Sequence, residues 1–389
     1  MRAAARLDGL GTTVFTEMTA LAERTGAINL GQGFPDVDGP PEAVEAVVAA
    51  LRSGRANQYA PLPGVPALRD AIFAHQRACY GLEPEDLIVT FGATEAIASA
   101  VLGLCDPGDE VVVLEPLYDS YAATITFAGA VRRTVPLRPP EFRLTEEALH
   151  EAISGGAGRA RLLLLNSPHN PTGRVLDASE LGLVARACAE HDLVCVSDEV
   201  YEHLVFDGEH VPPATLPGMA ERTLTISSVG KSFSFTGWKI GWASGPAELV
   251  SATRTAKQFL SFSGGTPLQH GAAAALALDR AVLDGLAAAL ATARDDLCDG
   301  LRAAGLEPFV PQGTYFVNAD VGTEAVAFCR ELPERAGVVA IPTQTFYDDK
   351  TIAPTLVRFA FCKRPAVIAE AAQRLASLSS RRHTPSQHP

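Results

Sequence analysis

The sequence predicts an α/β protein whose large domain contains a mainly parallel sheet flanked by helices, with a smaller α+β domain in addition. Three observations predict this fold class. The 389 residues exceed what one domain usually holds. Short, continuous apolar runs alternate with helical patterns through most of the chain, as in strands buried on both faces and joined by helices. After about Arg280 the strand-like pieces become shorter and the pattern becomes that of a second unit.

Five apolar runs, each of about five or six residues, are the expected strands of the large domain. They are Leu87–Phe91, Glu110–Glu115, Arg161–Asn166, Leu193–Asp198 and Thr223–Ser227. Each run ends in polar or turn residues. Ligands of parallel α/β sheets bind outside the carboxyl ends of the strands, so the polar residues at these ends are the first functional candidates.

The smaller domain is expected to begin with a long helix and to end with another. The helical patterns cover Ala281–Ala304 and Ala366–Ser377, and strand-like pieces lie between them at Thr314–Ala319, Val338–Ile341 and Leu356–Phe361. An N-terminal helix near Thr13–Arg24 is expected to complete this unit. We therefore divide the chain into an arm with part of the small domain (1–40), a large domain (41–280), a small domain (281–378) and a disordered tail (379–389).

Composition and charge exclude several classes of protein. Hydrophobic residues make up 47% and charged residues 20%, as in folded globular proteins. With 32 basic and 45 acidic residues the net charge is −13, and we expect neither nucleic acid nor a membrane surface as a partner. The alanine-rich stretch Gly271–Ala293 contains Asp279, Arg280 and Asp284, which indicates a soluble helix.

The sequence also indicates the compartment. Arg2 and Arg6 precede no apolar segment of the kind found in secretory signals. The seven cysteines are scattered and never spaced Cys-x-x-Cys, which favours reduced thiols. We therefore expect a cytoplasmic protein.

Three familiar motifs are absent. Gly31-Gln-Gly33 begins like a dinucleotide-binding turn, but Asp36 occupies the position of the third glycine. Gly230-Lys231-Ser232 ends like a phosphate-binding P-loop, but Thr225 replaces its first glycine. The nine histidines include no His-x-x-x-His pair, and we expect no cluster of histidine with cysteine and no metal site.

A lysine and an acid stand where two expected strands end. Leu193–Asp198 delivers Asp198, followed by Glu199 and Tyr201, and Thr223–Ser227 leads into Ser228 and Lys231. Small and aromatic residues flank Lys231, which suits a desolvated amine with a lowered pKa. Taken singly, the acid could equally be a helix cap and the lysine a surface residue.

Two further segments follow expected strands. Gly92-Ala93-Thr94 passes from strand to helix, so its backbone N–H groups and the helix dipole form a possible anion site. The segment from Asn166 to Gly173 is a turn with two prolines, which by itself indicates no more than a turn.

Together these features fit pyridoxal phosphate, which needs a lysine for its Schiff base, an acid beside its ring nitrogen and a phosphate cradle. From about Thr13 to the final helix the chain resembles the fold type I, class I/II pyridoxal-phosphate aminotransferases, the aspartate-aminotransferase-like group. The segments that carry this resemblance are 29–35, 57–59, 92–94, 115–118, 166–173, 197–201, 228–241 and 357–359. The resemblance implies an aminotransferase that acts on an amino acid and a 2-oxo acid.

The resemblance also implies a role for each site residue. Lys231 would form the Schiff base and move the substrate proton, Asp198 would pair with the ring nitrogen, and Tyr118 would stack on the ring. Tyr201 and Asn170 would bind the 3′ oxygen of pyridoxal 5′-phosphate. The phosphate would be bound by Gly92, Ala93, Thr94, Ser228, Lys239 and, from a neighbouring subunit, Tyr59, which implies a homodimer with shared active sites. Arg358, Asn170 and Gly33 would bind the substrate carboxylate.

Within this family the chain resembles most the branch of N-succinyldiaminopimelate aminotransferases of lysine biosynthesis, together with kynurenine and methionine aminotransferases. Gly31–Asp36, Glu199–Phe206, Phe361–Arg364 and Leu260–Pro267 carry that likeness. We expect Gly264 and Gly265 to leave room for a long substrate beside the partner's site. The alternatives are a kynurenine or methionine aminotransferase, a β-lyase of cysteine conjugates, and a non-enzymatic regulator. The last is disfavoured because the chain has no length to spare for a DNA-binding domain.

Overall fold

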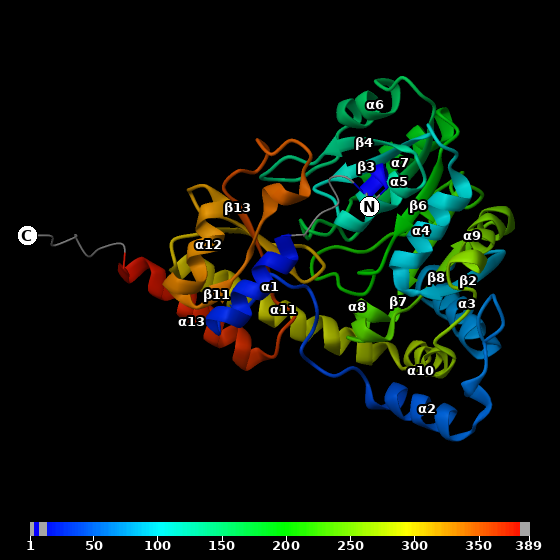
Figure 1. The fold of residues 1–389 in the computed structure, drawn as a ribbon, viewed down its shortest axis with the longest axis horizontal. Coiled ribbons are helices and arrows are strands. Elements are labelled where there is room, and N and C mark those ends of the chain that lie inside the picture. The colour runs from blue at the N-terminus through cyan, green and yellow to red at the C-terminus, as the bar shows by residue number, and fades with distance from the viewer. Residues whose placement is uncertain (1–3, 8–13, 382–389) are drawn as a thin grey trace, which may run out of the picture.

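The computed structural model describes residues 4–7 and 14–381 and folds them around one large and one small sheet (Figure 1). The helices are α1 Val14–Thr25, α2 Pro41–Arg52, α3 Pro66–Tyr80, α4 Gly92–Leu104, α5 Asp119–Phe127, α6 Glu146–Ser154, α7 Ala178–Glu190, α8 Val229–Ser232, α9 Ala247–Leu260, α10 Thr266–Leu276, α11 Arg280–Ala303, α12 Ala325–Ala336 and α13 Pro365–Arg381. The strands are β1 Ile28–Asn29, β2 Asp86–Phe91, β3 Glu110–Glu115, β4 Val131–Pro136, β5 Ala160–Asn166, β6 Val194–Asp198, β7 Thr223–Ser228, β8 Ile240–Gly245, β9 Glu307–Phe309, β10 Phe316–Asp320, β11 Val338–Val339, β12 Ile341–Pro342 and β13 Leu356–Ala360.

The large sheet has seven strands in the order β2-β8-β7-β6-β5-β3-β4. Strands β4, β3, β5, β6 and β7 pair in parallel, whereas β8 runs antiparallel to both β7 and β2. The expected α/β fold with a mainly parallel sheet is therefore confirmed. All five strands expected in this sheet are present, and β4 and β8 are two that the sequence reading missed.

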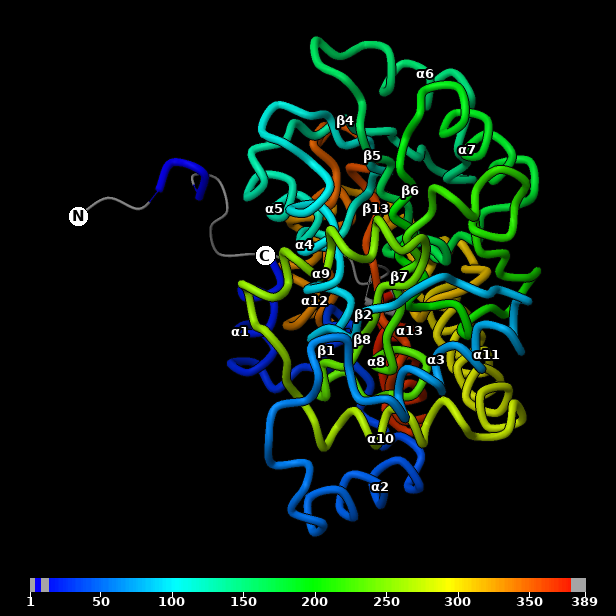
Figure 2. The backbone as a smooth tube through the Cα atoms, turned by 90° about the vertical axis from the view of Figure 1, so that its right-hand side faces the viewer, coloured from blue at the N-terminus to red at the C-terminus, as the bar shows by residue number. Residues whose placement is uncertain are grey.

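Helices cover both faces of the large sheet because its central strands are apolar on both sides. In β3, Val111 and Val113 face the core under α4, α5 and α9, whereas Val112 and Leu114 face the core under α6 and α7. Each fully buried aliphatic side chain of this kind stabilises the fold by about 1.5–3 kcal/mol. Helices α2 and α10 lie side by side at the β2–β8 end of the molecule (Figure 2).

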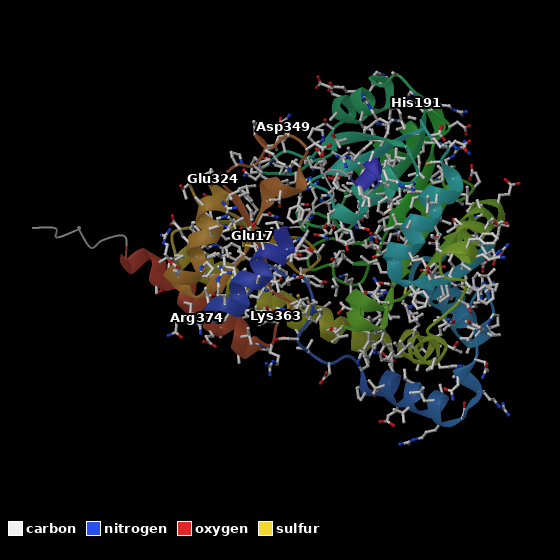
Figure 3. The ribbon with its side chains drawn as sticks, viewed as in Figure 1. Glu17, His191, Glu324, Asp349, Lys363 and Arg374 are labelled. Atoms are coloured by element: carbon white, nitrogen blue, oxygen red, sulfur yellow. The ribbon has the colours of Figure 1, made fainter. Side chains whose placement is uncertain are left out.

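The small sheet is antiparallel, in the order β12-β13-β10-β9, and packs with α11, α12 and α13 around one hydrophobic core. Helix α1 joins this unit through the parallel pair β1–β11. Glu17 of α1, labelled in Figure 3, also forms an ion pair with Arg330 of α12, with Nε and Oε1 3.2 Å apart. The N-terminal helix therefore completes the small-sheet unit, as expected.

Helix α11 belongs to both units. Leu283, near its start, packs in the core under α2, α3 and α10, and Leu297, near its end, packs in the core of the small sheet. The boundary expected at residue 280 thus falls at the start of a helix that spans the two units. Residues 379–381 of the expected tail lie in α13, and residues 382–389 lie outside the described residues.

Two expectations about elements are wrong. The stretch Gly271–Ala293 is not one helix, because α10 ends at Leu276 and α11 starts at Arg280, where the Asp279 side chain accepts a hydrogen bond from the N–H of Ala281. The piece Val338–Ile341 is split, since β11 pairs with β1 whereas β12 pairs with β13. Within the described residues, no helix has the length and apolar character that crossing a bilayer requires.

Candidate active site

A cavity of about 430 Å³ lies at the carboxyl ends of the large-sheet strands and is closed by residues of the small-sheet unit. This volume is typical of a site for a small molecule. The structure brings twelve of the thirteen expected site residues into the cavity lining: Gly33, Gly92, Ala93, Thr94, Tyr118, Asn170, Asp198, Tyr201, Ser228, Lys231, Lys239 and Arg358. The thirteenth, Tyr59, lies elsewhere and is 80% exposed.

Lys231 reaches the cavity from α8, the short helix that directly follows β7. Its Nζ lies 5.9 Å from the ring centre of Tyr201 and 5.8 Å from that of Tyr315. Burial lowers the pKa of this amine, although the nearby Cys362 and Asp198 act in the opposite direction. Among the described residues no side chain forms a hydrogen bond or ion pair with it, so its lone pair is available for covalent chemistry.

Asp198 ends β6 and is 4% exposed. The Tyr121 hydroxyl donates to its Oδ2 at 2.5 Å, and the N–H of Val200 donates to its Oδ1 at 3.3 Å. Burial raises the pKa of this carboxyl to about 6, against the lowering effect of those two hydrogen bonds and of the Lys231 amine. A buried carboxylate in this position is stabilised by a cationic group in the cavity.

An anion cradle lies at the start of α4. Gly92 has a left-handed φ of +70°, and a Cβ there would lie 3.3 Å from the Nζ of Lys239, so the lysine ammonium lies over the first turn of the helix. The N–H groups of Ala93 and Thr94 are in that turn, and Ser228 lines the same cavity from the end of β7. Backbone N–H groups, a hydroxyl and an ammonium are the donor set that binds phosphate.

Arg358 enters the cavity from β13 of the small sheet and is 2% exposed. Its Nη1 donates to Asn170 Oδ1 at 3.2 Å and its Nη2 donates to the carbonyl oxygen of Gly31 at 2.9 Å. The guanidinium carbon lies 4.1 Å from the ring centre of Phe316. Burial lowers the pKa of Arg358 to about 10.

No Asp or Glu among the described residues forms an ion pair with Arg358, and its buried Nε has no hydrogen-bond partner. Arg358 is therefore not part of a buried ion pair among the described residues. A cavity-lining guanidinium with unused donors suits a planar carboxylate ligand.

Gly33 lines the same cavity beside Phe316, the ring that the Arg358 guanidinium contacts. A Cβ at this position would come within 2.4 Å of the Phe316 ring, so only glycine allows the approach. Its carbonyl oxygen accepts a hydrogen bond of 2.7 Å from the Tyr315 hydroxyl. Tyr315 also forms an edge-to-face contact with Tyr201, with ring centres 5.3 Å apart.

Sequence reasoning missed Tyr121, Asn166 and Tyr315 as site residues. Tyr121 lies three residues after Tyr118, one turn into α5, so the helical period was a usable signal for it. Asn166 ends β5; its Nδ2 donates to the Asp198 carbonyl oxygen at 2.8 Å, and its Oδ1 accepts from the N–H of Asn170 at 2.8 Å. Tyr315 had no local signal, because its position depends on how the small sheet packs.

One sequence expectation is wrong and another stays a prediction. The expected absence of a histidine–cysteine cluster is wrong, because His75, Cys79 and His203 lie together. A Cβ on Gly264 would come within 2.0 Å of the Phe91 ring, and Gly265 has a left-handed φ of +65°. The glycine pair is thus constrained within its own chain, and the room expected beside a partner's site stays a prediction.

Comparison with known proteins agrees with this geometry. Residues 25–375 match the family model for aminotransferase class I and II. The chain is 49% identical to the probable N-succinyldiaminopimelate aminotransferase DapC of Mycobacterium tuberculosis, over 97% of this chain and 98% of that one. It is 39% identical to the methionine aminotransferase of Escherichia coli, over 96% and 97% of the two chains.

Among solved structures, the N-succinyldiaminopimelate aminotransferase of M. tuberculosis superposes with a TM-score of 0.93 over 97% of this chain and all of that one, at 49% identity. The expected fold, enzyme class and cofactor are confirmed: members of this family use pyridoxal phosphate to exchange amino groups between amino acids and 2-oxo acids. The chain belongs to the aminotransferase class I and II family.

Proposed function

We propose that this aminotransferase exchanges the amino group between N-succinyldiaminopimelate and the 2-oxoglutarate/glutamate pair. The observation that carries the proposal is the 49% identity, from end to end, with a relative that bears that name. On this proposal the enzyme acts in lysine biosynthesis, in the cytoplasm, as a homodimer.

The residues of the cavity fit the cofactor of the family. An amine without a partner, a buried carboxylate and an anion cradle are the three features that pyridoxal phosphate requires, and all three line one cavity. When bound, the cofactor supplies a carbonyl carbon that takes up the amino group and a ring that withdraws electrons from the substrate α-carbon. We propose that Lys231 binds its carbonyl carbon, and that Gly92, Ala93, Thr94, Ser228 and Lys239 bind its phosphate.

We propose that Asp198 faces the ring nitrogen and keeps it protonated. The hydrogen bonds from Tyr121 and Val200 occupy one side of each carboxylate oxygen and hold the group in one orientation. Tyr118 would cover one face of the ring, and Tyr201 and Asn170 would donate to the ring oxygen. Because Asp198 and Tyr201 are buried, their polar contacts act more strongly than they would in water.

We propose that Arg358 and Asn170 orient the substrate by its α-carboxylate. The guanidinium is already held by Asn170 and by the Gly31 carbonyl oxygen, so little side-chain entropy is lost on binding. This would place the α-carbon toward Lys231. The lysine Nζ, with its lowered pKa, would accept the proton from the α-carbon and deliver it to the former carbonyl carbon of the cofactor, after which water would release the 2-oxo acid.

A half-reaction tests the proposal. Purified protein with bound cofactor is mixed with glutamate, methionine, kynurenine or N-succinyldiaminopimelate while the cofactor absorbance is followed, and Lys231→Arg serves as the unreactive control. We expect N-succinyldiaminopimelate and glutamate to convert the cofactor to its amine form with release of a 2-oxo acid. Faster conversion by kynurenine or methionine would overturn the substrate assignment, and pyruvate with ammonia from a cysteine conjugate would show β-lyase activity instead.

A further inference from the structure

A second group of chemically reactive side chains lies outside the cavity, between α3 and the segment that follows β6. His75 and Cys79 are one turn apart on α3, and His203 faces them from the segment that carries Asp198 and Tyr201. The two histidines are 7% and 6% exposed, and Cys79 is partly exposed. The proposed amino transfer uses none of the three.

The donor atoms of this group are close together. The two Nε2 atoms are 2.8 Å apart, Cys79 Sγ lies 3.8 Å from His75 Nε2, and all three donor atoms lie within 4.8 Å of one another. The ring planes of the histidines are nearly perpendicular, at 84°. The two histidines come from different chain segments, and their Nε2 atoms approach one another.

These spacings are near those of a tetrahedral zinc site. Zinc–nitrogen bonds of about 2.0–2.1 Å and zinc–sulfur bonds of about 2.3 Å place two nitrogens about 3.3 Å apart and nitrogen and sulfur about 3.6 Å apart. The sulfur is already at nearly this distance from His75 Nε2. Binding would require the two nitrogens to separate by about half an ångström and the sulfur to approach His203 from within 4.8 Å to about 3.6 Å, which calls for side-chain rotation of Cys79.

Two charged side chains flank this group. Glu202 Oε2 lies 3.9 Å from His203 Nε2 and provides a buried negative charge beside the site. Arg280 donates to Cys79 Sγ at 3.9 Å, but burial and the Glu202 charge raise the pKa of this thiol, so zinc binding would have to release its proton.

We propose that His75, Cys79 and His203 form a zinc site, with water or the Glu202 carboxylate as the fourth ligand. Two histidines and a cysteine are a ligand set that favours zinc over hard cations such as magnesium. His203 is two residues after Tyr201, so a bound ion would tie α3 to the segment that presents Asp198 and Tyr201 to the cavity. With the Glu202 carboxylate as the fourth ligand, the site is a structural one.

Metal binding to the tag-free enzyme with its cofactor bound tests this site. The protein is stripped with a chelator and dialysed against Zn²⁺, and the metal content per chain is measured. Co²⁺ is then substituted, and its visible bands are recorded at wavelengths beyond the cofactor absorbance. We expect one zinc per chain, a cobalt spectrum of four-coordinate type, and a melting temperature that rises with Zn²⁺.

Two variants and a control identify the ligands. Cys79→Ser, a small change at a partly exposed helix end, should weaken zinc binding at least tenfold and remove the zinc-dependent rise in melting temperature. His203→Ala should do the same. Cys329→Ser, which changes a buried cysteine of α12, should bind zinc like the parent protein.

The proposal is overturned if the parent protein binds no stoichiometric zinc, if cobalt gives a six-coordinate spectrum, or if Cys79→Ser binds zinc as tightly as the parent. The 2.8 Å contact would then be a simple hydrogen bond between two neutral imidazoles. No step of this test uses amino transfer, so it is independent of which substrate the enzyme takes.

Discussion

The environment of Asp198 disfavours the charged form of its carboxyl until a cation enters the cavity. Burial raises the pKa of its carboxyl from 3.8 to about 6. A carboxyl with a raised pKa in the folded state binds its proton more tightly there than in the unfolded chain. The folded state of the cofactor-free protein therefore loses stability as the pH rises from 3.8 to about 6, and the effect is constant above that range.

This gives a prediction for the cofactor-free protein. The difference between the two pKa values corresponds to roughly 3 kcal/mol of unfolding free energy. We expect Asp198→Asn to remove this pH-dependent loss. The free energy of unfolding of the variant should therefore rise relative to that of the parent between about pH 4 and pH 6.5. Denaturant unfolding of both proteins at several pH values measures this difference. A parent–variant difference that does not change with pH would contradict the raised pKa.

Tyr121 gives a second prediction at the scale of one residue. In Tyr121→Phe the buried carboxylate of Asp198 loses its 2.5 Å hydrogen bond. A hydrogen bond to a charged group contributes about 1.5–3 kcal/mol, so we expect kcat/KM for glutamate to fall about tenfold or more.

The matched control for Tyr121 is Tyr347→Phe. Tyr347 is another buried tyrosine, and its hydroxyl donates to the carbonyl oxygen of Leu137, away from the cavity. This variant should lose stability without a change in kcat/KM. Equal losses of activity in the two variants would mean that Tyr121 acts through folding and not through Asp198.

The chemistry of single residues could be predicted from sequence where the residue type is unusual for its position. Arg358 lies in an apolar segment and Lys231 among small and aromatic residues, so the charge of each calls for an explanation. Tyr121 could not be singled out in this way, because an aromatic residue on a helix facing a sheet is ordinary core. Its spacing from Tyr118 could place it on the same face of α5, but the direction of its hydroxyl toward Asp198 depends on tertiary packing.

At the scale of elements, the start of α4 is the feature on which phosphate binding depends. Gly92→Ala would place a methyl group 3.3 Å from Lys239 Nζ and would force alanine into a left-handed backbone. We expect a loss of about 1–2 kcal/mol in stability and a clear rise in the dissociation constant of pyridoxal phosphate. Titration of the cofactor-free protein measures the second effect.

Gly81→Ala separates strain from binding. Gly81 ends α3 with a similar φ of +67°, and a Cβ there would meet nothing within 4 Å. We expect this control to lose stability by a similar amount and to bind the cofactor like the parent. If both variants bind the cofactor equally well, the first turn of α4 is not the phosphate site.

The central strands of the large sheet could be predicted from sequence. Strands β4 and β8 could not, because their residues do not form a continuous apolar run. Strand β3 is a continuous apolar run because helices cover both its faces. Strand β4 is at the edge of the sheet and carries Arg132 and Arg133, so its apolar signal is weak. Strand β8 follows directly on the loop after α8 and contains two glycines, which resemble turn residues. The alanine-rich stretch favours helix throughout, so the break between α10 and α11 had one sequence signal, the helix-capping residue Asp279.

At the scale of the whole molecule, the active site exists only because two units meet. Lys231 and Asp198 come from the large sheet, whereas Arg358 comes from β13 of the small sheet. The sequence could suggest that these residues act together only through resemblance to known enzymes, since about 130 positions separate Lys231 from Arg358 and no local pattern connects them. Helix α11 packs into both hydrophobic cores and so fixes the position of the small-sheet unit relative to the large sheet.

A surface patch supports the proposed homodimer. Tyr59, Phe259, Leu260 and Phe262 are 80%, 82%, 54% and 43% exposed, and the rings of Tyr59 and Phe262 are in edge-to-face contact at 5.6 Å. Two hydrogen bonds, from Ser263 to Ala60 and from Thr266 to Gln58, hold the two segments of this patch together. Exposed apolar groups gathered in this way are typical of a protein–protein interface.

The last prediction concerns this patch. Phe259→Glu would bury a charge at the proposed interface, and we expect sedimentation to show a shift from twice the chain mass toward the chain mass. If Tyr59 of the neighbouring subunit binds the phosphate, as the resemblance implies, the cofactor should then bind more weakly. Phe127→Glu, at an exposed phenylalanine that ends α5, is the control and should leave both properties unchanged. If Phe259→Glu keeps the parent's mass and cofactor affinity, the patch is not the subunit interface. If it becomes monomeric but keeps that affinity, the active sites are not shared.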